Sequence, residues 1–227
     1  MRWIWGVVLP LQDRLDAFTA EFETRTAPPE VVATLRRSTA ELIASGLAGR
    51  ALAAGARAPR FSLPDSHGEI VNSADLLIRG PLVLTFQRGS WCPYCTMDMR
   101  AIEAAAREIR ALGASVLAIS PQSELNSRKF EKDNGLSFSI LRDSGNAVAH
   151  EFGLRYRVSQ DVIAVYKGFG NDLVAGNGED SLTLPLPARY VIGRDGIVAY
   201  AEVNADYTRR PDPREWMPVL ESLSAHR

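Results

Sequence analysis

The chain has 227 residues, which suits one large domain or a domain with a substantial extension. Hydrophobic residues make up 46% of it and charged residues 23%, a globular composition that excludes wholesale disorder. Twenty-six Lys and Arg against twenty-seven Asp and Glu give a formal net charge of −1, so no overall positive field would attract nucleic acid or acidic lipid.

The N-terminal region is predicted to be a helical extension. An apolar stretch at residues 3–11 is far shorter than the ~20 residues of a membrane-spanning helix, and no signal-cleavage site follows it. We therefore expect a cytoplasmic protein with no membrane segment. Apolar residues at helical spacing, interrupted by Pro28 and Pro29, predict two or three helices in the first fifty-odd residues. These helices contain neither Cys nor His, so packing or formation of a homodimer is their expected role.

A change in composition near residue 55 separates this extension, residues 1–55, from a domain at residues 56–227. Turn-forming residues predict a β-hairpin at 60–72. A continuous apolar run predicts a buried strand at 81–87, and a helix is predicted after it, ending at Gly113. A strand at 114–120, a helix at 123–135 and a strand at 136–141 complete a βαβα alternation, which indicates parallel strands with helices on both faces.

The last third of the chain is predicted to close the sheet. Short helices are expected at 146–154 and 161–169, with a glycine-rich insertion reaching residue 181. Strands at 190–192 and 197–203 flank a turn at 193–196, and a final helix is expected at 213–223 in spite of Pro218. The whole pattern predicts an α/β domain.

Two cysteines, Cys92 and Cys95, lie where the predicted central strand gives way to the long helix. Pro93 suits the first helical position, which makes Cys92 the N-cap. Unpaired N–H groups and the helix dipole lower the pKa of a thiol there, so we expect Cys92 to be the more acidic and the more exposed of the two. Cys95 should point inward, with its Cα about 5 Å from that of Cys92, within the range for a disulfide.

Other interpretations of these cysteines are weaker. They are too few and too close for the disulfide framework of a secreted domain. Buried core thiols are an alternative, but the neighbouring Trp91 and Pro93 and the start of a helix favour a redox pair. A zinc site lacks partners, because His67, His150 and His226 show no ligand spacing. We expect no metal and no organic cofactor.

The chain resembles the alkyl hydroperoxide reductase/thiol-specific antioxidant (AhpC/TSA) family, a peroxiredoxin-like group of the thioredoxin-fold superfamily. The resemblance runs from about residue 55 to residue 223 and is carried, in order, by the segments RAPRFSLPDSHGEIV, PLVLTFQRGSWCPYC, LAISPQS and LPLPARYVIGRDGIV. It implies a thioredoxin-like fold, a central mixed β-sheet flanked by helices, with the N-terminal helices as an extension. It also implies that the protein is a thiol peroxidase.

Two templates within this superfamily disagree about the attacking sulfur. The peroxiredoxin pattern F-x-P-x-x-x-T-x-x-C, matched without gaps over ten positions, makes Cys95 the attacker and puts Cys92 at the threonine and Arg88 at the proline. The thioredoxin pattern W-C-x-x-C makes Cys92 the attacker and Cys95 the resolving thiol. The longer match favours Cys95, whereas the position at the helix N-terminus favours Cys92.

The chain also differs from many peroxiredoxins at the position before the last hairpin, where they have an arginine. Pro187 stands there and matches the cis-proline that thioredoxins place opposite their cysteines. Arg189 or Arg88 is a candidate replacement for the missing cation, although both are ordinarily surface residues. Ser90 and the backbone N–H groups at the helix start are further candidate donors to the leaving oxygen.

Three functions follow as hypotheses. The first is a thiol peroxidase that reduces hydrogen peroxide or organic hydroperoxides, closes a Cys92–Cys95 disulfide, and is reduced by thioredoxin, glutaredoxin or glutathione. The second is a thiol-disulfide oxidoreductase acting on protein disulfides. The third is a redox-silent binding module that uses the same fold.

Overall fold

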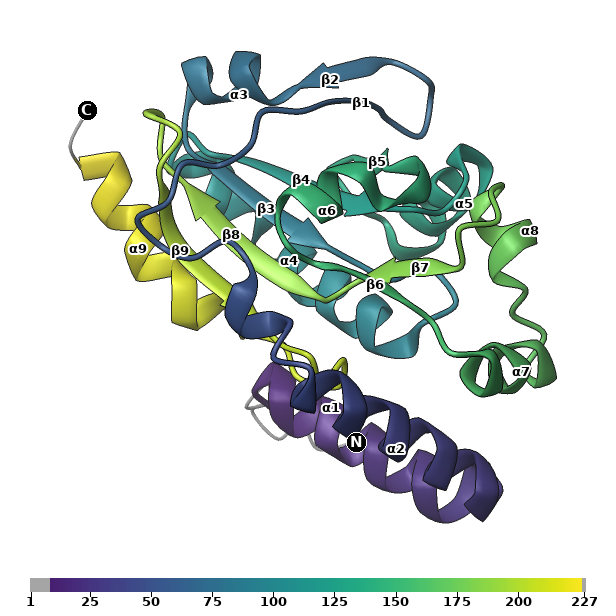
Figure 1. Ribbon diagram of the computed structural model, residues 1–227. Helices are drawn as coiled ribbons and strands as arrows, with labels where there is room; N and C mark the ends of the chain where they lie inside the picture. Colours follow the sequence, from purple (N-terminus) through teal and green to yellow (C-terminus); the bar gives the residue numbers. More distant parts are fainter. Residues whose placement is uncertain (1–8, 226–227) are drawn as a thin grey trace, which may run out of the picture.

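The computed structural model describes residues 9–225, so most of the apolar start of the chain, and His226, lie outside the described residues. A five-stranded sheet in the order β5-β4-β3-β8-β9 forms its centre (Figure 1). The strands are β3 Leu82–Phe86, β4 Ser115–Ser120, β5 Ile140–Arg142, β8 Ala188–Ile192 and β9 Val198–Val203. Strands β3, β4 and β5 are parallel, while β8 and β9 are antiparallel to their neighbours. The predicted mixed sheet is confirmed.

Every residue of β3 is buried, as its continuous apolar sequence predicts for a central strand covered on both faces. Alternate residues of the sheet supply two cores. One core is shared with three helices, α4 Pro93–Ala111, α5 Glu124–Asn134 and α9 Pro213–Ala225. The opposite face is covered by α3 Ser73–Arg79, by α6 Ala147–Glu151 and by the segments around them.

The remaining elements lie around this frame. The predicted hairpin is formed by β1 Ser62–Pro64 and β2 Ile70–Asn72. The glycine-rich insertion is more regular than predicted, because β6 Arg155–Arg157 pairs with β7 Thr183–Pro185 and encloses α7 Gln160–Gly168 and α8 Leu173–Asn177. Pro218 is tolerated inside α9, whose Trp216 and Leu220 are fully buried. Short helical turns are η1 Phe22–Thr26, η2 Ala48–Arg50 and η3 Ser144–Asn146.

The N-terminal helices are α1 Leu11–Glu21 and α2 Pro29–Ala44, and they lie beside the sheet rather than over either face (Figure 1). Helix α1 contacts α4 and helix α2 contacts α7. Leu11 and Leu15 of α1 are buried, and the Leu11 N–H donates to Asp212 Oδ2 at 2.9 Å. No helix between residues 9 and 225 has the length and apolar character needed to cross a membrane. The boundary near residue 55 remains a prediction.

Candidate active site

The two cysteines lie where β3 leads into α4. Pro93 is the first residue of the helix and Cys92 is its N-cap, as predicted. Both thiols are free, and each residue has only 1% of its surface exposed. The expectation that Cys92 would be the more exposed thiol is therefore wrong. Leu11 and Leu15 of α1 pack in one cluster with Tyr94 and both cysteines, and sequence reasoning about α4 alone did not include this cover.

The two thiols have opposite acid–base properties. Burial alone raises the pKa of Cys92, but a hydrogen bond from Cys95 and the positive charges of Arg88 and Arg210 outweigh it and lower the pKa to about 5. The hydrogen bond to Cys92, followed by burial, raises the pKa of Cys95 well above its ordinary value. At neutral pH the pair is therefore a Cys92 thiolate that accepts a hydrogen bond from the Cys95 thiol.

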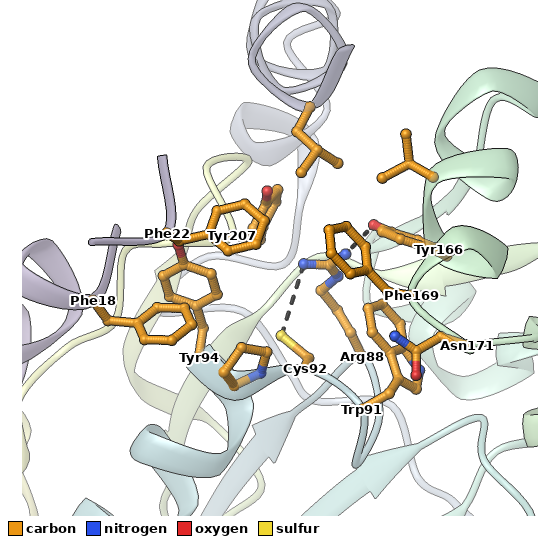
Figure 2. Close-up of a pocket in the computed structure, with 13 residues that line it drawn as sticks. Phe18, Phe22, Arg88, Trp91, Cys92, Tyr94, Tyr166, Phe169, Asn171 and Tyr207 are labelled. Carbon is orange, nitrogen blue, oxygen red and sulfur yellow. Dashed lines mark hydrogen bonds between the residues drawn. The ribbon is translucent and has the colours of Figure 1, made fainter. Parts of the chain in front are cut away.

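Arg88 is buried with 1% of its surface exposed, so its interpretation as an ordinary surface residue is wrong. Its Nη1 lies 3.8 Å from Cys92 Sγ, and its Nη2 donates to the Tyr166 hydroxyl. The guanidinium carbon lies 4.1 Å from the centre of the Tyr207 ring and 4.9 Å from that of Trp91. These aromatic faces stabilise a cation that would otherwise be costly to bury. Figure 2 shows Arg88 between Cys92 and Tyr166.

Arg189 is also buried, with 1% of its surface exposed, so its interpretation as a surface residue is wrong. Unlike Arg88, it binds a carboxylate. Its Nη2 donates to Asp98 Oδ1 at 2.8 Å. The other oxygen of Asp98 lies 3.6 Å from Nε of Arg210, whose Nη2 is 3.8 Å from Cys95 Sγ. The structure thus gives Cys92 and Cys95 one arginine each, Arg88 and Arg210, while Arg189 pairs with Asp98.

A pocket of about 200 Å³ lies over Cys92 (Figure 2). Cys92 belongs to its lining and Cys95 does not. Its wall combines the segment from Arg88 to Tyr94 with three other parts of the chain that are distant in sequence. The lining side chains are mostly aromatic or aliphatic and include Phe18, Phe22 and Leu35 from the N-terminal helices, Val165, Tyr166 and Phe169 from the insertion, and Tyr207.

The other predicted site residues have structural surroundings of their own. The Ser90 N–H donates to Gln122 Oε1 at 2.7 Å, which fastens the loop before α4 to the loop after β4. The Trp91 ring packs on Tyr166 with ring centres 4.7 Å apart. Pro187 precedes β8, at the end of the sheet where β3 leads to Arg88. Residues 9–225 contain no cis peptide bond, so the bond before Pro187 is trans and the match to a thioredoxin cis-proline is not reproduced.

Several site residues escaped the sequence reasoning, notably Asp98, Tyr166, Tyr207 and Arg210. Arg210 is 115 positions from Cys95, and no pattern in the segment YTRRP marks it as a partner of a thiol. Asp98 could have been predicted as a buried partner, because it lies one helical turn after Cys95 on the face that we expected to point inward. Within residues 9–225, no group of three or more His, Cys, Asp or Glu side chains is placed to hold a metal ion.

A family model described as AhpC/TSA family matches residues 54–201. The chain belongs to the AhpC/TSA family. Peroxiredoxin Q, chloroplastic, from Triticum aestivum is 28% identical over 216 residues, covering 94% of this chain and 88% of that protein. Peroxiredoxin Bcp from Escherichia coli strain K12 is 33% identical over 103 residues, covering 45% of this chain and 65% of that protein.

The fold of this AhpC/TSA member is that of solved peroxiredoxins. Peroxidoxin BcpB from Mycobacterium tuberculosis superposes with a TM-score of 0.59 at 23% identity, covering 78% of this chain and 99% of that one. This match confirms the predicted thioredoxin-like fold. The relatives named above support a thiol peroxidase of the peroxiredoxin type. The N-terminal helices α1 and α2 and Arg210 lie outside the residues that the family model matches.

Proposed function

We propose that this protein reduces hydroperoxides with Cys92 as the attacking thiol and Cys95 as the resolving thiol. The Cys92 thiolate attacks one peroxide oxygen, the O–O bond breaks, and the product alcohol or water leaves Cys92 as a sulfenic acid. Cys95 then displaces water from that sulfenic acid to form the disulfide. An external dithiol of the thioredoxin type supplies two electrons and two protons to restore both thiols.

The single observation that carries this assignment is that Cys92, with the Arg88 guanidinium at its Sγ, lines the pocket while Cys95 does not. The charge stabilises the thiolate before reaction, and the guanidinium N–H groups are donors for the oxygen that leaves as an anion. These observations favour Cys92 over Cys95, although the ten-position peroxiredoxin pattern favours the reverse.

A thiol-disulfide oxidoreductase is the second candidate, because an acidic thiol at the N-cap of W-C-x-x-C also suits attack on a disulfide. The burial of Cys92 argues against it. A disulfide carried on a folded protein has to reach a sulfur that is 1% exposed and covered by α1 and Tyr94, whereas a small hydroperoxide needs only the pocket.

The test of the proposed function uses the reduced full-length chain. Protein is mixed with hydrogen peroxide, with cumene hydroperoxide or with an oxidised protein disulfide, each with thioredoxin, thioredoxin reductase and NADPH, and NADPH oxidation is followed. Turnover with a peroxide and little with the protein disulfide supports the proposal. The reverse order supports the oxidoreductase, and inertness in all three assays supports the redox-silent module.

The pH dependence of the first step follows from the pKa of Cys92. Because that pKa is lowered to about 5, the reactive anion predominates above pH 5 and is lost below it. We expect the rate of Cys92 oxidation to rise with pH through about 5 and to stay flat up to pH 8. The measurement uses the Cys95→Ser variant, whose hydroxyl can still donate to Cys92, with thiolate absorbance and iodoacetamide labelling followed from pH 4 to 9. A midpoint near 8.5, the value of an ordinary cysteine, contradicts the assignment.

The apolar pocket predicts a preference for hydroperoxides with a bulky apolar group. Phe18→Ala combined with Phe22→Ala removes two rings of the wall, one in α1 and one in η1. We expect the catalytic efficiency with cumene hydroperoxide to fall about tenfold, because apolar contacts in a pocket contribute on this scale. Hydrogen peroxide has no apolar group that these rings could bind, so its efficiency should change by less than about threefold. Leu125→Ala, an exposed apolar site on α5, is the matched control. Equal losses for both peroxides would contradict a role in specificity.

The homodimer and the cytoplasmic location remain predictions. Sedimentation of the purified protein tests the first, and fractionation of the source cells tests the second.

A further inference from the structure

A second buried arginine lies at the second sulfur of the pair. Arg210 Nη2 is 3.8 Å from Cys95 Sγ, the same separation as that between Arg88 and Cys92. Its side chain is only 3% exposed. It comes from the segment between β9 and α9, which the family match does not include. Tertiary contacts therefore bring Arg210 to a sulfur that lies 115 positions away in the sequence.

The guanidinium of Arg210 is held on several sides. Its Nη1 donates to the carbonyl oxygens of Tyr207 and Arg209, and its Nε lies 3.6 Å from Asp98 Oδ2. The Arg210 backbone N–H donates to Gln12 Oε1 of α1 at 3.2 Å. Side chain and backbone are thus fixed by contacts with three parts of the chain, and the charge is pre-organised at Cys95 before any reaction occurs.

We propose that Arg210 is a second catalytic residue, which stabilises the Cys95 sulfur as an anion while the disulfide closes. This inference rests on the proposed function, with Cys92 oxidised first. In the reduced pair Cys95 stays protonated, and its S–H group donates a hydrogen bond to the Cys92 thiolate. Once Cys92 has become a sulfenic acid, that anion is gone, and the positive charge of Arg210 favours release of the Cys95 proton.

The step balances as follows. The Cys95 thiolate attacks Cys92 Sγ, the S–S bond forms and the S–O bond of the sulfenic acid breaks. The hydroxide that leaves takes up the proton that Cys95 released, giving water. Cys95 is oxidised and the Cys92 sulfur is reduced, so no further oxidant or reductant takes part.

The charged and titratable groups around Cys95 come from several elements. Of the two arginines that favour its anion, Arg210 has the larger effect and Arg88 the smaller. Helix α1 contributes the apolar residues Leu11, Leu15 and Phe18 to this cluster. Cys92 at the N-cap of α4 and Tyr156 of β6 also interact with Cys95, and Asp98 of α4 and Glu202 of β9 interact with Arg210. Arg189 of β8 pairs with Asp98.

The test separates the two chemical steps in a single turnover. Reduced wild type, Arg210→Gln and Arg210→Lys each receive one equivalent of hydrogen peroxide between pH 5 and 9. Samples are quenched with dimedone at fixed times, and mass spectrometry measures the sulfenic adduct and the disulfide. In Arg210→Gln we expect the oxidation of Cys92 at pH 7 to change by less than about threefold, because a pKa near 5 leaves the thiolate predominant even after a rise of one unit.

Disulfide closure in Arg210→Gln is expected to slow about tenfold or more at pH 7, and its pH midpoint to rise by about one unit. The sulfenic acid then persists, and in a parallel sample with excess peroxide it is oxidised further to sulfinic acid. Arg210→Lys, which keeps the charge beside Asp98, should restore part of the rate and return the midpoint toward wild type. Arg209→Gln, an exposed neighbour that pairs with Asp16 and Asp206, is the matched control and should behave as wild type.

The inference is overturned if Arg210→Gln closes the Cys92–Cys95 disulfide at the wild-type rate and with an unchanged pH midpoint. An equal slowing of both steps also overturns it, because a purely structural role for Arg210 predicts that result. A wild-type protein that forms neither a sulfenic acid nor a disulfide with peroxide overturns the proposed function itself, and this outcome is visible before any variant is made.

Discussion

Cys92→Ser is expected to lower the rate constant for peroxide reduction by more than about a thousandfold, to the level of the uncatalysed reaction. A serine hydroxyl stays protonated beside Arg88, so the attacking anion is lost even though the shape of the site is nearly unchanged. Cys95→Ser should leave the first oxidation within about tenfold of wild type, because the serine hydroxyl can still donate to the thiolate. It should abolish disulfide formation.

A stopped-flow measurement of peroxide consumption, with one equivalent per chain and then with excess, distinguishes the two variants. Cys95→Ser should consume one equivalent in a fast phase, with further oxidation of the sulfenic acid following only in excess peroxide, and mass spectrometry should find the oxygen on Cys92. Cys92→Ser should consume almost none. The opposite assignment, with Cys95 as the attacker, predicts that the two variants exchange these results.

Arg88→Met is expected to slow peroxide reduction at pH 7 about a hundredfold, the loss typical when a single donor to a developing oxyanion is removed. Methionine fills much of the same buried space but carries neither charge nor N–H groups. The pKa of Cys92 should rise in this variant, because the Arg88 charge is one of the causes that lower it. The rate of Arg88→Lys should lie between those of wild type and Arg88→Met. An ammonium group keeps the charge but lacks the planar guanidinium that contacts both Cys92 and Tyr166.

Tyr166→Phe is the matched control for Arg88. It removes the hydroxyl that accepts from Nη2 but keeps the aromatic ring over which the guanidinium lies. We expect at most a tenfold loss, roughly the contribution of one hydrogen bond to a charged group. The rate constants are measured with hydrogen peroxide after denaturant unfolding shows that each variant is folded. An Arg88→Met protein with the wild-type rate and a Cys92 midpoint still near 5 would remove the basis of the assignment.

The fold was largely predictable because its signals are local or periodic. The apolar run of β3 predicted a central strand, and the alternation of strands and helices predicted the parallel part of the sheet. The insertion was described less well, because the pairing of β6 with β7 joins residues 155–157 to residues 183–185. Short strands of this kind are formed by tertiary contacts rather than by the propensity of their residues.

The sequence by itself determined the position of the cysteines at the start of α4, because capping, the proline at N1 and the spacing of two thiols act within one helical turn. It did not determine their exposure, the direction of Arg88 and Arg189, or the presence of Arg210 beside Cys95. Arginines are seldom fully buried unless they are paired, and their partners here lie on other elements. Only the tertiary structure brings α1, the insertion and the segment before α9 around α4, and these contacts decide which sulfur carries the charge.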